Sequence, residues 1–136
     1  MTPTTSTTPY ERGDIALVRF LFADEQGAKQ RPVLVLSGGE YHAGRQEVIV
    51  AALTSNVSRL LPGDHLIEEW KDAGLPKPSV ATGILRTIKR TMIGRVLGRM
   101  TARDLSAYQK VLRKMLGLQS PSPKTTPSSG PEPASS

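Results

Sequence analysis

The residues of this chain that could carry chemistry are an arginine and a cluster of polar side chains. Cysteine is absent and the two histidines are isolated, which excludes disulfides, thiolate chemistry and most zinc sites. Any chemistry must therefore use oxygen and nitrogen groups. Arg31 precedes Pro32 and an apolar run, and the polar residues Thr54, Ser55 and Asn56 follow another apolar run. A charge at a strand edge and side chains that cap a turn are the alternative interpretations.

Short apolar runs that alternate with polar loops predict a mainly β fold. Pro32 has no N–H, so it suits the first residue of a strand, and it favours an extended conformation at Arg31. Between these strands we expect polar connections, including residues 23–30 and a loop that contains His42. The predicted strands cover residues 15–22, 33–36, 47–53, 79–85 with 86–88 beyond them, and 92–100, and residues 65–67 could form one more.

One amphipathic helix follows the predicted strands. Apolar residues recur at nearly four-residue spacing from Leu105 to Leu116. Thr101, with Asp104 three residues later, predicts the start of this helix, and Gly117 predicts its end. The helix therefore completes a mainly β domain that also contains α structure.

The composition predicts one ordered domain between two polar ends. Residues 1–9 are rich in Thr and Pro, and residues 119–136 are rich in Ser and Pro, so we expect a flexible N-terminal segment and a disordered tail. Residues 10–118 would then form the domain. Neither a run long enough to span a membrane nor a secretory signal is present in the sequence, so we expect a cytoplasmic protein that does not bind membranes.

The charge of the chain favours a polyanionic partner. Lys and Arg number 18 against 12 Asp and Glu, which gives a formal net charge of +6. Basic residues crowd the segment 86–114, where Asp104 is the only acid. Nucleic acid or an acidic protein segment would fit this distribution, and a solvated basic face is the alternative. Near the acidic cluster of residues 68–72, we expect Trp70 to cover a barrel edge rather than bind a base, and His65 to be an ordinary surface residue.

The order of several short motifs resembles the MazF/PemK-like toxins of bacterial type II toxin–antitoxin systems. The resemblance runs from Arg12 to Leu118. It implies a small SH3-like (CcdB/MazF/PemK-type) β-barrel of five to six or seven short strands with a C-terminal helix. The motifs are Gly13-Asp14-Ile15, Arg31-Pro32-Val33-Leu34-Val35-Leu36-Ser37, Leu53-Thr54-Ser55, Gly74-Leu75-Pro76-Lys77-Pro78-Ser79-Val80, Arg86-Thr87-Ile88 and Gly98-Arg99-Met100.

The resemblance also implies an activity and partners. It implies a homodimeric endoribonuclease, an mRNA interferase, that cuts single-stranded mRNA at a short sequence and needs neither a metal nor another cofactor. An acidic cognate antitoxin would hold it inactive, and contact with DNA would come only through the antitoxin complex. The products would carry a 2′,3′-cyclic phosphate and a 5′-hydroxyl.

The resemblance assigns catalysis to Arg31 and Thr54. Arg31 would stabilise charge on the phosphate, and Thr54 would bond a phosphate oxygen or the attacking hydroxyl. Glu25, in the loop before Arg31, is the candidate for proton transfer or for orienting Arg31. The expected substrate-binding residues are Lys29, Gln30, Ser55, Asn56 and Arg86.

Two positions depart from the family pattern and leave an alternative function open. Ala81 and Gly83 stand nearest to the places where some members carry an arginine and an aspartate. The alternative is a non-catalytic inhibitor of a protein target, of the CcdB type, or a degenerate toxin that only binds antitoxin or RNA.

Overall fold

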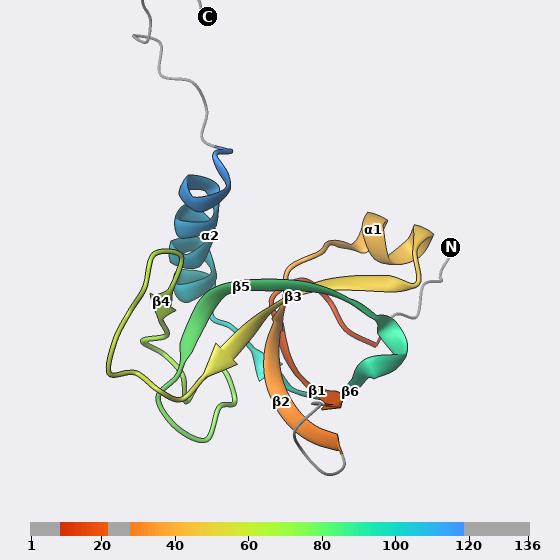
Figure 1. Ribbon diagram of the computed structural model, residues 1–136, viewed down its shortest axis with the longest axis horizontal. Helices are drawn as coiled ribbons and strands as arrows, with labels where there is room; N and C mark the ends of the chain where they lie inside the picture. The colour runs from red at the N-terminus through yellow and green to blue at the C-terminus, as the bar shows by residue number, and fades with distance from the viewer. Residues whose placement is uncertain (1–8, 22–27, 119–136) are drawn as a thin grey trace, which may run out of the picture.

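Six antiparallel strands form one sheet in the order β4-β5-β3-β2-β1-β6 (Figure 1). The computed structural model describes residues 9–21 and 28–118. Along the chain, the elements are β1 (Asp14–Leu21), β2 (Ala28–Val35), α1 (Gly39–Gly44), β3 (Glu47–Thr54), β4 (His65–Leu66), β5 (Val80–Lys89), the 3₁₀ turn η1 (Arg90–Met92), β6 (Ile93–Arg99) and α2 (Ala102–Leu116).

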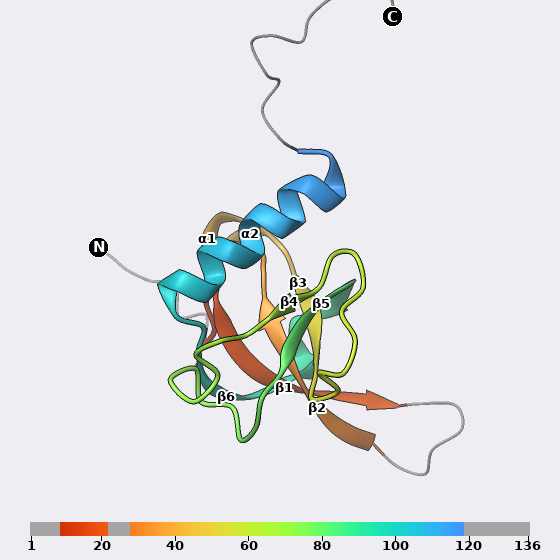
Figure 2. The same ribbon diagram turned by 90° about the vertical axis from the view of Figure 1, so that its left-hand side faces the viewer.

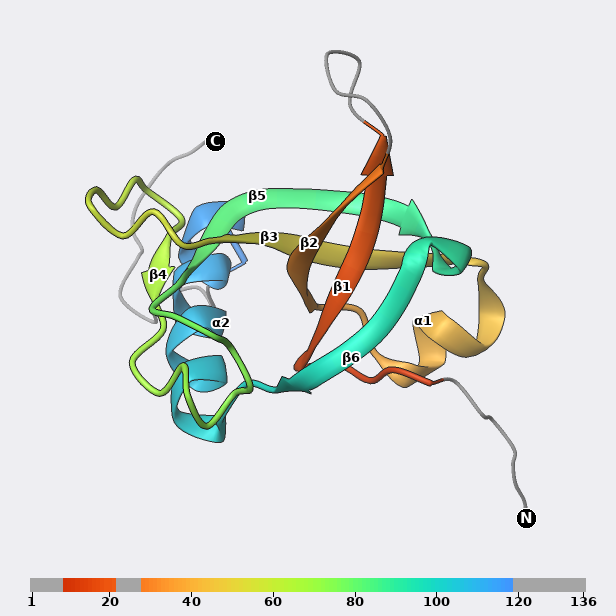
Figure 3. The same ribbon diagram turned by 90° about the horizontal axis from the view of Figure 1, so that it is seen from below.

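The sheet is strongly curled. Figure 3 shows β1 and β2 crossing β3 and β5 at a steep angle, which follows from the twist that accumulates between neighbouring strands. Within the described residues, the edge strands β4 and β6 do not pair with each other, so the sheet is open between them. The mainly β fold with six strands and a C-terminal helix confirms the predicted architecture.

The two faces of the sheet bury separate apolar clusters, because successive residues of a strand point to opposite faces. On β2, Leu34 belongs to a cluster with Ile15, Ile67 and Tyr108, against which Leu105 and Leu112 of α2 pack. The helix lies across this side of the sheet (Figure 2). The neighbours of Leu34 on β2 point the other way, into the cluster of the opposite face, which contains Tyr10, Val18, Val33, Val35, Val48, Val50 and Ile88.

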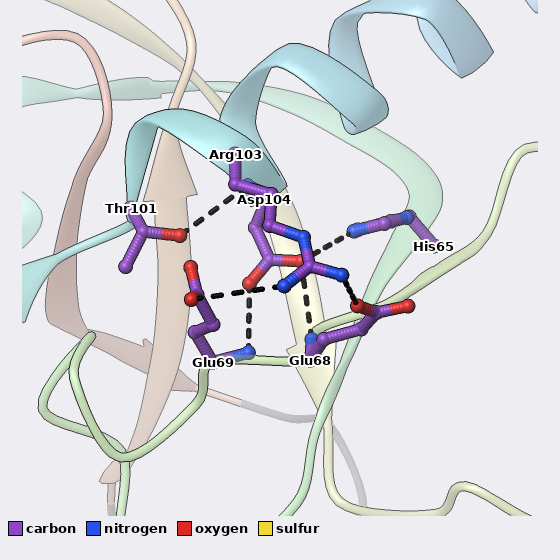
Figure 4. A network of polar contacts seen from close by, with 6 residues as sticks. All are labelled: His65, Glu68, Glu69, Thr101, Arg103 and Asp104. Atoms are coloured by element: carbon purple, nitrogen blue, oxygen red, sulfur yellow. Dashed lines mark hydrogen bonds and ion pairs between the residues drawn. The ribbon is translucent and has the colours of Figure 1, made fainter.

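Asp104 fixes α2 to the segment that follows β4 (Figure 4). Asp104 is 1% exposed, and its carboxylate accepts hydrogen bonds from His65 Nε2 at 2.9 Å, from the Glu68 N–H at 3.1 Å and from the Glu69 N–H at 2.8 Å. Burial raises the pKa of Asp104, but these three donors outweigh burial and hold the pKa below its usual value of 3.8. Thr101 caps the helix by accepting the Asp104 N–H at 3.3 Å.

The Asp104 contacts correct the expectation for His65, which is not an ordinary surface residue. The His65 side chain is only 15% exposed and is bonded to the buried carboxylate. Trp70, by contrast, is partly buried and packs against the core cluster. Gly117 ends α2 in a left-handed conformation with φ of 72°, which confirms the predicted C-cap.

Two glycines allow the segment before β5 to cross β6 closely. A Cβ atom on Gly74, whose φ is +86°, would lie 2.5 Å from the carbonyl oxygen of Leu97. A Cβ atom on Gly98 would likewise collide with the carbonyl oxygen of Ala73. Neither position can accept a side chain without moving backbone.

The loop expected around His42 contains the short helix α1. The His42 ring is buried, lies edge-on to Tyr10 with ring centroids 4.9 Å apart, and shares a hydrogen bond of 2.6 Å between Nε2 and Ser37 Oγ. Ser37 Oγ also accepts the Ile49 N–H at 3.0 Å. Burial lowers the pKa of His42, so the ring is a neutral part of the core at pH 7.

Candidate active site

Arg31 and Thr54 both line the opening where β2 and β3 separate. The two strands pair at Val33 with Ala52 and at Val35 with Val50, and beyond Val33 they separate, so Arg31 and Thr54 stand on the two sides of the opening. By strand alternation, both side chains lie on the face of the sheet that carries Val33 and Val50. They stand at the rim of the apolar cluster on that face.

Arg86 joins this pair from the next strand. It pairs with Val50 across β3 and β5, so its side chain lies on the same face as Val50. Both arginines are exposed. Strands β2, β3 and β5 thus bring two guanidinium groups and one hydroxyl to the same opening in the sheet.

Pro32 is the fifth residue of β2, and the prediction that it begins the strand is wrong. It pairs with Leu17 of β1, whereas pairing with β3 starts only at Val33. Because proline lacks an N–H, it cannot donate to β3, and this fits the point at which the two strands part. Pro32 also lines the opening that results.

A groove of about 320 Å³ lies between the separated strands. Apolar side chains form much of its lining, and the two arginines and Thr54 add its polar groups. A cationic groove with an apolar lining suits a ligand that carries both phosphate and base. Its lining residues are Arg31, Pro32, Val33, Val50, Ala52, Leu53, Thr54, Ile84 and Arg86.

Thr54 keeps a hydrogen-bond donor for a ligand. Its Oγ1 accepts the Asn56 N–H at 3.1 Å, and a hydroxyl that accepts one bond still has its own proton to donate. The cap that the sequence suggested for this turn is therefore present. It does not use up the hydroxyl.

A second arm of about 570 Å³ continues the groove past Thr54. The two spaces share Ala52, Leu53, Thr54 and Ile84. The wall of the second arm comes from the segment between β3 and β4 and from the middle of β5. Its other lining residues are Asn56, Ser58, Arg59, Leu61, Pro62, Asp64, Thr82 and Gly83.

A shift in the register of β5 shapes this second arm. Ala51 pairs with Leu85 but Leu53 pairs with Ala81, so β5 contains extra residues around Gly83. Thr82 Oγ1 donates to the carbonyl oxygen of Ala52 at 2.7 Å, which fixes the irregular stretch to β3. The sequence predicts an interruption at Gly83, and β5 continues through it.

Asp64 holds the two walls of the second arm together. Its Oδ1 accepts the Gly83 N–H at 2.9 Å and its Oδ2 accepts the Leu61 N–H at 2.9 Å. Asp64 was not predicted from the sequence to have a role. The only signal was its place in the turn Pro62-Gly63-Asp64, where an aspartate commonly bonds nearby backbone.

The remaining predicted site residues do not all reach the groove. Asn56 lines the second arm, whereas Ser55 is exposed and lies outside both sets of lining residues. Gln30 pairs with Arg19 and points to the face opposite Arg31. Glu25 lies outside the described residues, as does the side chain of Lys29.

The described part of the chain contains no group of three or more His, Asp or Glu side chains that could hold a metal ion. The polar groups that line the two arms of the groove are guanidinium, hydroxyl and amide groups, with Asp64 as the one carboxylate among the described lining residues. Both oxygens of that carboxylate already accept backbone N–H groups.

The family of the chain follows from its sequence. Residues 11–116 match the family described as PemK-like, MazF-like toxin of type II toxin–antitoxin systems. The chain belongs to this family. The predicted resemblance is thereby confirmed for nearly all of the described residues. No curated protein matches the chain.

Solved structures of PemK/MazF-like toxins share the fold. The Mycobacterium tuberculosis toxin MazF-mt6 is 26% identical, with a TM-score of 0.64 over 78% of this chain and 98% of that chain. A MazE-MazF structure (Form II) from Deinococcus radiodurans is 20% identical, with a TM-score of 0.68 over 84% and 100%. An endoribonuclease in complex with its cognate antitoxin, from a mycobacterial species, is 20% identical, with a TM-score of 0.65 over 82% and 99%.

Helices in the described part of this toxin are too short or too polar to cross a membrane.

Proposed function

We propose that this PemK/MazF-like toxin is an endoribonuclease that cuts single-stranded RNA at a short sequence without a metal ion. The observation that carries the proposal is the meeting of Arg31, Thr54 and Arg86 in one groove. One structural neighbour is described as an endoribonuclease. A guanidinium group offers several fixed donors to phosphate oxygens, and the Thr54 hydroxyl adds another.

In the proposed reaction, a ribose 2′-oxygen attacks the adjacent phosphorus and the bond from phosphorus to the 5′-oxygen breaks. The 2′-hydroxyl loses its proton to a base, and the departing 5′-oxygen gains one. The products are a 2′,3′-cyclic phosphate and a 5′-hydroxyl. Water is not consumed in this step.

Arg31 and Arg86 would stabilise the negative charge that builds up on the phosphate oxygens, and Thr54 would donate to one of them. An arginine is a poor general base because it stays protonated at any working pH. Glu25 remains our candidate for proton transfer or for orienting Arg31.

Incubation of the purified toxin with a long single-stranded RNA, with and without EDTA, tests the proposal. We expect cleavage in both conditions, fragments that end in a cyclic phosphate, and a loss of cleavage in Arg31→Ala and Thr54→Val. Arg45→Ala is the matched control, because Arg45 is exposed and pairs with Glu47. Loss of cleavage in EDTA, or full activity of both groove variants, would contradict the proposal. So would growth arrest that leaves cellular mRNA intact and damages DNA, which a CcdB-like inhibitor would cause.

We also propose a homodimer and an acidic antitoxin segment that occupies the same groove. Structural neighbours include MazE-MazF structures and an endoribonuclease bound to its cognate antitoxin. The net charge of +6 and the two arginines of the groove favour an acidic partner there. An acidic antitoxin peptide should compete with RNA for the toxin. Simultaneous binding of peptide and RNA would contradict a shared groove.

A further inference from the structure

The second arm of the groove contains one amide side chain whose orientation is fixed. Asn56 Oδ1 accepts hydrogen bonds from the Ser58 N–H at 3.2 Å and from Ser58 Oγ at 2.7 Å. A backbone N–H can only donate, so the Asn56 atom that faces it must be the oxygen. The NH₂ group of Asn56 is therefore directed away from Ser58.

This NH₂ group is a donor without an acceptor among the described residues. Asn56 is exposed and lines the second arm, and its only hydrogen bonds there are the two to Ser58 and the one from its own N–H to Thr54. Both hydrogens of the amide are therefore available to a ligand. The side chain therefore offers a ligand hydrogen-bond donors, because its acceptor oxygen is already bonded to Ser58.

The position of Asn56 relative to Thr54 determines which part of an RNA would meet it. The Asn56 N–H is bonded to Thr54 Oγ1, so the two residues belong to one tight turn. When a phosphate lies at Arg31 and Thr54, the base of a flanking nucleotide can enter the second arm. Leu61, Pro62 and Ile84 give that arm apolar surface for an unstacked base.

The bases differ in what they present to a pair of donors. Every base carries acceptors elsewhere on its ring, but at the exocyclic position next to the Watson–Crick edge uracil O4 and guanine O6 accept, whereas cytosine N4 and adenine N6 donate. A donor amide aimed at this position bonds uracil or guanine and would face another donor in cytosine or adenine. A site that is built to hydrogen-bond a substrate group discriminates strongly against a substrate that leaves it unpaired.

We propose that Asn56 selects a base with a keto oxygen, uracil or guanine, at a nucleotide that flanks the scissile phosphate. The inference rests on the proposed ribonuclease function, since it assigns base selection to the second arm of the same groove. Asp64 supports this selection as a positioning residue, because it ties Leu61 and Gly83 into the walls of the arm.

The test uses sets of four RNAs that differ only in one base beside the cut site. Cleavage rates are measured, and binding is measured separately on RNAs with a 2′-O-methyl group at the cut site, which cannot react. We expect the full-length toxin to favour uracil or guanine over cytosine and adenine by about tenfold at one flanking position. Asn56→Asp replaces the NH₂ group by oxygen and retains the acceptor for Ser58, so the preference should vanish or turn toward cytosine and adenine.

Gln46→Glu is the matched control, since it makes the same amide-to-acid change at an exposed residue outside both arms. It should keep the keto preference. An unchanged preference in Asn56→Asp and Asn56→Ala, or no preference in the parent toxin at either flanking base, overturns the inference.

The two readouts separate this inference from the proposed function. A toxin that binds the uncleavable RNAs with a keto preference, loses it in Asn56→Asp and cuts no RNA would support base selection and refute cleavage. A toxin that cuts RNA with a base preference that substitution of Asn56 does not alter would support cleavage and refute base selection by Asn56. A toxin that neither binds nor cuts any RNA of the sets would refute both the proposed function and base selection by Asn56.

Discussion

The Asp104 cluster and the Arg31 groove use similar polar groups for opposite purposes. At Asp104 a buried carboxylate accepts three hydrogen bonds, and the cluster joins the start of α2 to the segment after β4. In the groove, Thr54 and Asn56 also bond their neighbours, but each keeps a donor that these bonds do not use. Partners that are fully satisfied within the fold indicate stability, whereas oriented donors left over in a groove indicate a ligand.

The largest effect on stability should come from removing the Asp104 carboxylate, whose hydrogen bonds are all made within the fold. Asp104→Ala would leave the N–H groups of Glu68 and Glu69 without their acceptor, so we expect a loss of about 3–5 kcal/mol in the free energy of unfolding. Urea denaturation measures it. Arg103→Ala is the control, because its ion pairs with Glu68 and Glu69 are exposed and should contribute no more than about 1 kcal/mol. Equal losses in the two variants would contradict the assignment.

Arg31 should show the opposite pattern, with a large effect on activity and a small one on stability. We expect Arg31→Ala to lower kcat/KM by about 100- to 1,000-fold, because it removes charge stabilisation in the transition state. The free energy of unfolding should change by no more than about 0.5 kcal/mol, since the side chain is exposed. Arg31→Lys should recover part of the activity, because it restores the charge without the planar fork. An Arg31→Ala variant that unfolds readily but cuts RNA normally when folded would reverse our assignment.

Asp64 lies between these extremes, since it is a structural group in the wall of the groove. Asp64→Asn keeps one acceptor oxygen but presents an NH₂ group to a backbone N–H, so one of the two walls should loosen. We expect KM for RNA to rise by about tenfold with a smaller change in kcat. Asp72→Asn, at an exposed acid outside the groove, is the control. A fall in kcat at unchanged KM would place Asp64 in the chemical step instead.

The smallest effect concerns the buried ring of His42. Burial lowers the pKa of His42 in the folded protein, so below the usual value of 6.5 the unfolded chain binds a proton that the folded chain does not. The free energy of unfolding should therefore fall as the pH drops from about 7.5 to about 5.5. Guanidinium unfolding across this range should give a flatter dependence for His42→Gln. An equal slope in both proteins would show that His42 does not cause it.

Patterns along the chain predicted the elements better than the contacts between them. The helix was predicted nearly to its ends because Thr101, Gly117 and a four-residue period are local signals. The apolar runs likewise predicted five strands and indicated the short β4. α1 was missed, since it has six residues and a glycine at each end.

Site residues that belong to a sequence motif were predictable, whereas residues that reach the site only through long-range contacts were not. Arg31 and Thr54 stood out as motif residues, and the fold brings both to one groove. The bonds from Gly83 to Asp64 and from Glu68 and Glu69 to Asp104 span 19 to 36 residues along the chain, which no local pattern encodes. The different outcomes for Ser55 and Asn56 depend on the turn that Thr54 and Asn56 form, and its hydrogen bonds are visible only in the structure.

The close crossing at Gly74 and Gly98 has a consequence for genetics. A selection for cells that survive expression of a toxin collects every substitution that abolishes it, whatever the cause. Because nearly any side chain at these two glycines displaces backbone, such substitutions should appear among the survivors alongside changes at Arg31. A reporter of soluble protein, read for each survivor, would divide the collection into toxins that never fold and toxins that fold but do no harm.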